Sequence, residues 1–290
     1  ILGINGQNHD ASMALINGQD ILWAAHAERY SRVKNDSNLN HDMVAEMLRY
    51  GEPKQVVWFE KPWLKNLRRL YAGQQPWRVD PKEELKRLGL DHLPVEYVAH
   101  HESHAAAGFY TSGFEDAAIL VIDAIGEWDT VTIWHGQGQN LKRKWSKRYP
   151  NSIGLFYTAM TQYVGLKPNE EEYILMGMAA FGQPTVADEM RETFFKNWEP
   201  PNFSLRYNLH QGCRWWEPKH PVSKFDIAAS AQAIIEDYLL MTVDWIDEHI
   251  DTDNLVFMGG VALNCVANSL IAQSYAFERI HIMPNPGDAG

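Results

Sequence analysis

The feature that most constrains the fold is a near-continuous apolar run from Ala117 to Ile122, which ends in Asp123. A run of this kind is typical of a strand buried on both faces, because a half-exposed strand alternates polar and apolar residues. The run therefore predicts a central strand of a sheet with an acid at its carboxyl end. In open α/β sheets, that end of the strands is where ligands bind.

The pattern around this run occurs twice in the chain. Each copy consists of a strand, a polar turn, a second strand, a glycine turn and a third strand. The first copy begins at Ile1 and the second begins at Ala118. No sequence identity connects the two copies, so the similarity is one of architecture alone. It predicts an α/β protein with two mixed-sheet lobes, over residues 1–113 and 114–290, with an insertion near 184–225.

Other segments predict the elements between these strands. Helices are expected at 153–163 and around 226–249, and a two-residue hairpin turn at Asn17-Gly18. Residues 61–80 look like an irregular excursion. Residues 198–221, which are rich in Pro, Asn and Trp, either line a substrate site or form a surface insertion.

Two such lobes would clamp a nucleotide. The turns after each first strand, 6–10 and 123–129, would offer backbone N–H groups to its phosphates. Gly259 and Gly260 follow a further apolar strand and would let the backbone approach the nucleoside. Asn264 comes after them, and it either recognises the nucleoside or caps a helix. The residues assigned to nucleotide binding in this way are Gly126, Glu127, Gly259, Gly260 and Asn264.

Three histidines occur within five residues, at positions 100, 101 and 104. If the segment is helical, His100 and His104 lie on one face, one turn apart, which is the spacing at which two imidazoles hold one metal ion. Asp123 could complete a set of two histidines and one carboxylate with open coordination positions. A surface or capping cluster is the alternative interpretation of the pair.

Composition limits the class of protein. The chain has 290 residues, of which 45% are apolar, and this is enough for two lobes with real cores. A net charge of −11 argues against broad non-specific binding to nucleic acid. Two cysteines, no membrane-length apolar run and no signal peptide predict a soluble, cytoplasmic protein without a membrane partner. The sequence leaves open whether the protein forms a homodimer.

Seven stretches resemble, in the same order, the O-carbamoyltransferases of the NodU/TobZ type, a branch of the actin-like (RNase H-like, ASKHA) ATPase superfamily. They are Gly3 to Ser12, Glu28 to Lys34, His100 to Ala107, Val121 to Glu127, Glu172 to Gly182, Gly259 to Asn264, and Pro284 to Gly290. Together they span nearly the whole chain. One departure is Ile174, where many members of the family have lysine.

The resemblance implies an activity. In this family a C-terminal domain makes carbamoyl adenylate from carbamoyl phosphate and ATP, and the actin-like region transfers the carbamoyl group to an acceptor hydroxyl. Acceptors in the family include sugars, natural products and hydroxymethylated nucleobases. The resemblance also leads us to expect that the second lobe is incomplete at its C-terminal end, with the adenylate-forming domain outside this chain.

The resemblance also implies roles for individual residues. A divalent metal, iron in the better-known members, would be held by His100, His104, Asp123 and Asp288. His9, beside Asp10, becomes a candidate general base for the hydroxyl, whereas the residues alone favour a turn in which Asp10 caps a local N–H. The candidates for contact with phosphate, carbamoyl oxygens or nucleotide are Arg32, Lys34 and Gly177.

Two other functions fit parts of this pattern. An actin-like ATPase or kinase would use Asp123 as a base and Mg²⁺ as its metal, but it does not need the histidine pair. A metal- and nucleotide-binding module without transfer activity is the second alternative. The cationic residues near Lys34 could equally be a solvated strand end.

Overall fold

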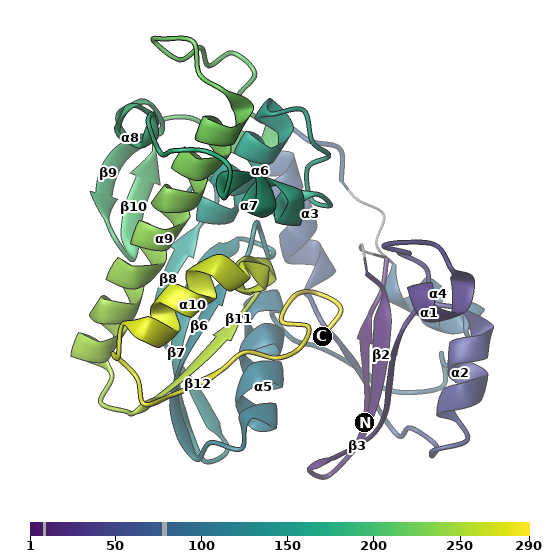
Figure 1. Cartoon of the computed structure of the whole chain (residues 1–290). Helices are drawn as coiled ribbons and strands as arrows, with labels where there is room; N and C mark the ends of the chain where they lie inside the picture. Colours follow the sequence, from purple (N-terminus) through teal and green to yellow (C-terminus); the bar gives the residue numbers. More distant parts are fainter. Residues whose placement is uncertain (8–9, 77–79) are drawn as a thin grey trace. The chain divides into compact units, whose positions relative to one another are not determined.

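The computed structural model describes residues 1–7, 10–76 and 80–290, and these divide into two compact units (Figure 1). Unit 1 contains residues 1–104 with 126–128 and 288–290, and unit 2 contains 105–125 and 129–287. Each unit is built on a five-stranded sheet with parallel and antiparallel neighbours. The predicted α/β fold with two mixed sheets is therefore confirmed.

The sheet of unit 1 has the strand order β3-β2-β1-β4-β5. Its strands are β1 (Leu2–Asn5), β2 (Ser12–Asn17), β3 (Asp20–His26), β4 (Val56–Trp58) and β5 (Val95–Tyr97). β1 pairs antiparallel with β2 and parallel with β4, so that it is the central strand. Its carboxyl end, at Asn5, therefore lies where this kind of sheet places ligands.

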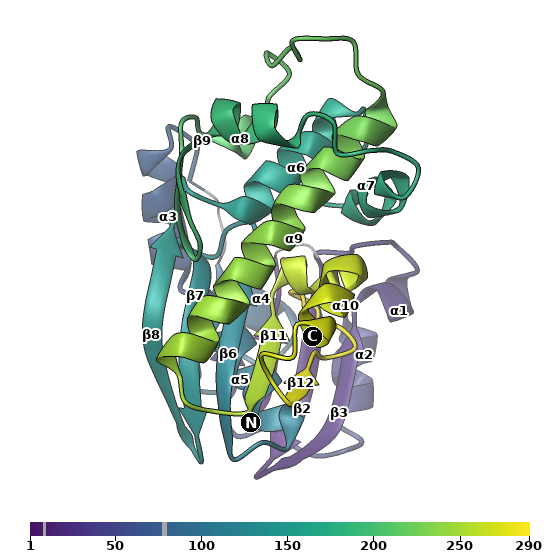
Figure 2. The same cartoon turned by 60° about the vertical axis from the view of Figure 1, so that its left-hand side comes forward.

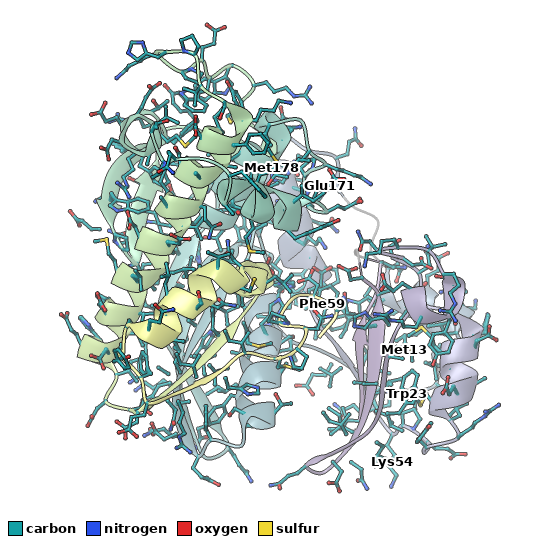
Figure 3. The ribbon with its side chains drawn as sticks, in the orientation of Figure 1. Met13, Trp23, Lys54, Phe59, Glu171 and Met178 are labelled. Atoms are coloured by element: carbon teal, nitrogen blue, oxygen red, sulfur yellow. The ribbon has the colours of Figure 1, made fainter. Side chains whose placement is uncertain are left out.

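Unit 1 contains the helices α1 (Glu28–Ser31), α2 (His41–Met47), α3 (Pro62–Tyr71) and α4 (Pro81–Arg87). Of these, α2 and α4 contribute side chains to the core that packs on the sheet. Met13 and Trp23 point toward α2 and join its Met43 and Met47 in one core (Figure 3). The prediction of irregular structure at 61–80 is wrong over α3, whose first residue, Pro62, is favoured at a helix start.

The sheet of unit 2 has the order β12-β11-β6-β7-β8. Its strands are β6 (Asp116–Ile122), β7 (Asp129–Gln137), β8 (Asn140–Arg148), β11 (Asn254–Met258) and β12 (Arg279–His281). Every residue from Ala117 to Ile122 is fully buried, because alternate side chains join cores on opposite faces of the sheet. This confirms the predicted central strand.

One face of this sheet carries α6 (Ile153–Tyr163), α9 (Lys224–His249) and α10 (Cys265–Gln273), and α9 runs across it (Figure 2). The other face carries the second half of α5 (His100–Ser112), through Ala105 and Phe109. The remaining elements are α7 (Glu172–Ala179), α8 (Ala187–Phe194), β9 (Phe195–Glu199), β10 (Asn202–Leu205), η1 (Leu209–Gln211) and η2 (Gly260–Leu263). Among the described helices, none is long and apolar enough to cross a bilayer.

The hairpins β2–β3 and β7–β8 close with the same two-residue turn. Asn17 still pairs with Asp20, so the turn residues are Gly18 and Gln19, one position later than predicted. Gln137 likewise pairs with Asn140 around Gly138. The two glycines have φ values of +61° and +57°, whereas Gln19 and Gln139 do not have positive φ. Positive φ at the first turn position alone is the type II′ pattern.

Candidate metal centre

The two spaced histidines lie on one buried face of α5. His100 is the first residue of this helix, and His104 follows one turn later. Their Nε2 atoms are 3.2 Å apart, and the residues are only 3% and 7% exposed. The predicted helical geometry is therefore confirmed, and a surface cluster is excluded.

A carboxylate from the far end of the chain joins this pair. Oδ1 of Asp288 lies 3.2 Å from Nε2 of His104 and 3.4 Å from Nε2 of His100. Metal–ligand bonds of about 2.1 Å that meet at about 90–110° separate their ligand atoms by about 3.0–3.4 Å. The three atoms therefore have the spacing of ligands around one metal ion.

The charge on Asp288 suits this role. Burial by itself would raise the pKa of Asp288, but the neighbouring imidazoles of His100 and His104 hold that pKa well below its usual range. The side chain therefore stays a carboxylate, which is the form that binds a metal. A nitrogen–nitrogen–oxygen set of this kind suits zinc, iron or another transition metal better than magnesium, which prefers oxygen ligands alone.

Asp123 belongs to unit 2, where it follows the last residue of β6. Its Oδ1 accepts a hydrogen bond of 2.8 Å from the N–H of Ala124, and its own N–H donates to the carbonyl of Thr130. A Cβ added to Gly260 would lie 3.1 Å from the same Oδ1. The backbone on both sides thus fixes the predicted fourth ligand at the strand end, and its coordination stays a prediction.

A buried carboxylate holds the start of α5. Both oxygens of Glu127 accept a hydrogen bond of 3.1 Å from the N–H of His100, and one accepts the N–H of Lys61 at 2.8 Å. Glu127 is 5% exposed, and an acid at this end also complements the helix dipole. The Ser103 hydroxyl donates to the carbonyl of Phe59 at 2.9 Å, which ties the same turn of α5 to the end of β4.

Because of these contacts, we expect Glu127→Gln to destabilise the protein by about 1–3 kcal/mol, since an amide accepts fewer N–H groups than a buried carboxylate. The change would be measured as the shift of the urea unfolding midpoint. Glu83→Gln, which alters an exposed acid in the first turn of α4, is the matched control and should change stability by less than about 0.5 kcal/mol. Equal effects of the two substitutions would contradict this role of Glu127.

Sequence reasoning missed two buried polar residues of unit 1. Glu60, 2% exposed, accepts hydrogen bonds from Lys65, and burial raises the pKa of Glu60 despite that cation. Nδ2 of Asn5 donates to the carbonyls of Asp10 at 3.0 Å and of Asp288 at 2.7 Å. Its position at the end of a central strand was the available signal for Asn5.

The other predicted residues of unit 1 lie in different settings. His9 lies outside the described residues, and Asp10 adopts a positive φ of 62°. Arg32 and Lys34 are exposed beyond α1, and Lys34 lies 3.4 Å from Glu28. Gly126 needs its small size, because an added Cβ would lie 2.9 Å from the ring of His101.

The residues of unit 2 that were predicted to bind the nucleotide also lie in different settings. Gly259 has a φ of +90°, and Gly260 follows it at the start of η2. Asn264 caps α10 through the N–H of Ala267 and exchanges two hydrogen bonds with Gln232, so the capping role is present. Gly177 is exposed on α7, with open space where a Cβ would be.

Solved structures share this fold. HypF from T. kodakarensis superposes with a TM-score of 0.53 at 11% identity, over 100% of this chain and 46% of HypF. Component A of the Acidaminococcus fermentans (R)-2-hydroxyglutaryl-CoA dehydratase gives 0.50 at 13% identity, over 98% of this chain and 91% of that one. These similarities establish an actin-like fold and nothing more.

Sequence comparison identifies the family. The family model described as carbamoyltransferase N-terminus matches residues 67–290, and the chain therefore belongs to this family. It is 32% identical to the uncharacterized protein sll1178 of Synechocystis over its whole length, and 25% identical over 97% of its length to nodulation protein NolNO of Sinorhizobium fredii. It spans 55% and 45% of these two proteins, about half of each. The resemblance seen in the motifs is thus confirmed.

Proposed function

We propose that this chain is the transferring region of an O-carbamoyltransferase, which moves a carbamoyl group from carbamoyl adenylate to an acceptor hydroxyl. The adenylate would be made from carbamoyl phosphate and ATP. The observation that carries the proposal is the convergence of His100, His104 and Asp288 on one point in a member of this family. A kinase of the same fold does not need two histidines there.

The proposed metal site consists of His100, His104 and Asp288 with Asp123 as a fourth ligand. Iron is the metal proposed from the family resemblance, and the two nitrogen donors favour it over Mg²⁺. When bound, the ion would supply positive charge that neutralises the phosphate of the donor. The protein residues would hold that charge in place and exclude water, which the low exposure of both histidines supports.

The proposed transfer step uses His9 as general base, with Asp10 beside it. The acceptor oxygen attacks the carbamoyl carbon, the bond from that carbon to the phosphate oxygen breaks, and AMP leaves with the electron pair. The hydroxyl proton goes to His9. The proposed donor- and nucleotide-binding residues are Arg32, Lys34, Gly126, Glu127, Gly177, Gly259, Gly260 and Asn264.

The test is direct. The full-length protein would be incubated with carbamoyl phosphate, ATP and candidate acceptors (sugars, natural products and hydroxymethylated nucleobases), and products would be identified by mass spectrometry. We expect carbamoyl phosphate-dependent exchange between ATP and pyrophosphate, and a carbamoylated acceptor. A phosphorylated acceptor formed without carbamoyl phosphate would contradict the proposal in favour of a kinase.

We expect Gly260→Val to weaken ATP binding by at least about 10-fold, because valine puts side-chain atoms where the nucleoside would approach the backbone. Calorimetry would measure the affinity. The metal content should be measured in parallel, because the new side chain would also press on the carboxylate of Asp123. The control is Ser146→Val, which introduces the same side chain on the edge strand β8. Unchanged ATP affinity in Gly260→Val would show that the nucleoside lies elsewhere.

A further inference from the structure

We propose that Asn5 recognises the amino group of the carbamoyl donor, and that it thereby selects a carbamoyl group over other acyl groups. This role rests on the proposed function. Asn5 is the last residue of β1, the central strand of unit 1, and it is only 6% exposed. Its side chain lies between the turn that contains Asp10 and the loop that contains Asp288.

The orientation of the Asn5 amide is fixed by its partners. Nδ2 donates to the carbonyl oxygen of Asp288 at 2.7 Å and to the carbonyl oxygen of Asp10 at 3.0 Å. A carbonyl oxygen only accepts hydrogen bonds, so the amide nitrogen must face both of these groups. Turning the amide over would place its oxygen against two other oxygens, and the remaining direction therefore belongs to Oδ1.

The amide oxygen of Asn5 needs a hydrogen-bond donor. Oδ1 of Asn5 is buried and has no hydrogen-bond partner among residues 1–7, 10–76 and 80–290. A buried acceptor without a donor is costly, and native proteins rarely keep one unless a ligand or water supplies the donor. Within the described part of the chain, Asn5 is therefore held by its nitrogen and leaves its oxygen as an unpaired acceptor at the end of the central strand.

The position of this acceptor links it to the candidate metal centre. Asn5 binds the backbone of Asp288, and the carboxylate of the same residue lies beside His100 and His104. One residue thus connects the amide of Asn5 to the place where the donor's phosphate and carbamoyl groups are proposed to lie. All of these residues belong to unit 1.

The chemistry of the donor then decides which group meets Oδ1. At the reacting end of the donor, ionised phosphate oxygens and the carbamoyl carbonyl only accept hydrogen bonds, so they cannot satisfy an amide oxygen. The carbamoyl NH₂ has two N–H donors and no net charge, and it matches a neutral acceptor. An acetyl group has a methyl in the same place, which would leave the acceptor buried and unpaired.

The experiment compares two stable donor analogues, sulfamoyl esters of adenosine that carry either a carbamoyl or an acetyl group. They differ only in NH₂ against CH₃, and calorimetry would measure their affinities for the metal-loaded protein. We expect the wild-type protein to bind the carbamoyl analogue about 10- to 100-fold more tightly. This comparison needs no variant, so it does not depend on how well a substituted protein folds.

Asn5→Ala should reduce this preference to about one while weakening both analogues through the loss of its bonds to Asp10 and Asp288. A purely structural role would lower both affinities equally and leave the ratio unchanged. The matched control is Asn40→Ala, which removes an asparagine that caps α2 in the same unit. It should lower stability and keep the full preference.

Two results would overturn the proposal while donor binding stands. They are equal affinities of the wild-type protein for the two analogues, and an undiminished preference in Asn5→Ala. Either would mean that Asn5 does not select the carbamoyl group. If the wild-type protein binds neither analogue, the proposed function fails together with the role of Asn5.

Discussion

His104→Ala is expected to weaken the binding of a divalent transition metal by more than about 100-fold. Losing a hydrogen-bond partner of a metal ligand typically costs about 10- to 100-fold, and His104 is proposed as a ligand itself. Its Nε2 lies 3.2 Å from both His100 Nε2 and Asp288 Oδ1, so its loss removes one corner of the donor set. Titration with Co²⁺, whose visible spectrum reports the coordination of the ion, would measure the affinity.

His92→Ala is the matched control, since it removes an exposed histidine from the same unit. It should bind Co²⁺ as the wild-type protein does. A ligand present at about 100 times its Kd stabilises the folded state by about 2.7 kcal/mol, so a chelator should lower the Tm of the wild type and of His92→Ala but not that of His104→Ala. Full metal occupancy in His104→Ala would contradict the assignment.

The parts of the fold that were predictable are those where the pattern of apolar residues in the sequence matches the residues that are buried. The run from Ala117 to Ile122 is buried on both faces, and α6 begins where Ser152 caps it, so both were assigned correctly. α3 breaks this rule. Its Leu67 and Leu70 are more than half exposed, whereas Arg68 is buried. A helix with its apolar residues outside and a cation inside does not produce the pattern of a surface helix.

The site shows the same limit. His100 and His104 were predictable because four residues in a helix bring two side chains together. Asp288 is 184 residues from His104, so spacing alone could not connect them and only the family resemblance did. Asn5 and Glu127 bind backbone groups of other segments, and such contacts leave no periodic trace in a sequence.

Gly259→Ala is expected to destabilise unit 2 by roughly 3 kcal/mol or more. Gly259 follows β11 with φ +90° and ψ 168°, a conformation that is almost confined to glycine and costs another residue about 1–3 kcal/mol. An added Cβ would also lie 2.2 Å from the carbonyl oxygen of Ile122, at the end of the neighbouring strand β6. Neither strand can retreat easily, because Met258 and Ile122 are both fully buried.

The same substitution at Gly177 provides the control and should have the opposite sign. Gly177 lies inside α7 with nothing within 4 Å of an added Cβ, so alanine should stabilise that helix by about 0.5–1 kcal/mol. Urea unfolding followed by tryptophan fluorescence would compare both variants with the wild type. If Gly259→Ala unfolds at the wild-type midpoint, β11 and β6 do not approach each other at this point. The loop after β11 would then be free to adopt an ordinary conformation, and the reason for a glycine beside Asp123 would have to be sought in the ligand alone.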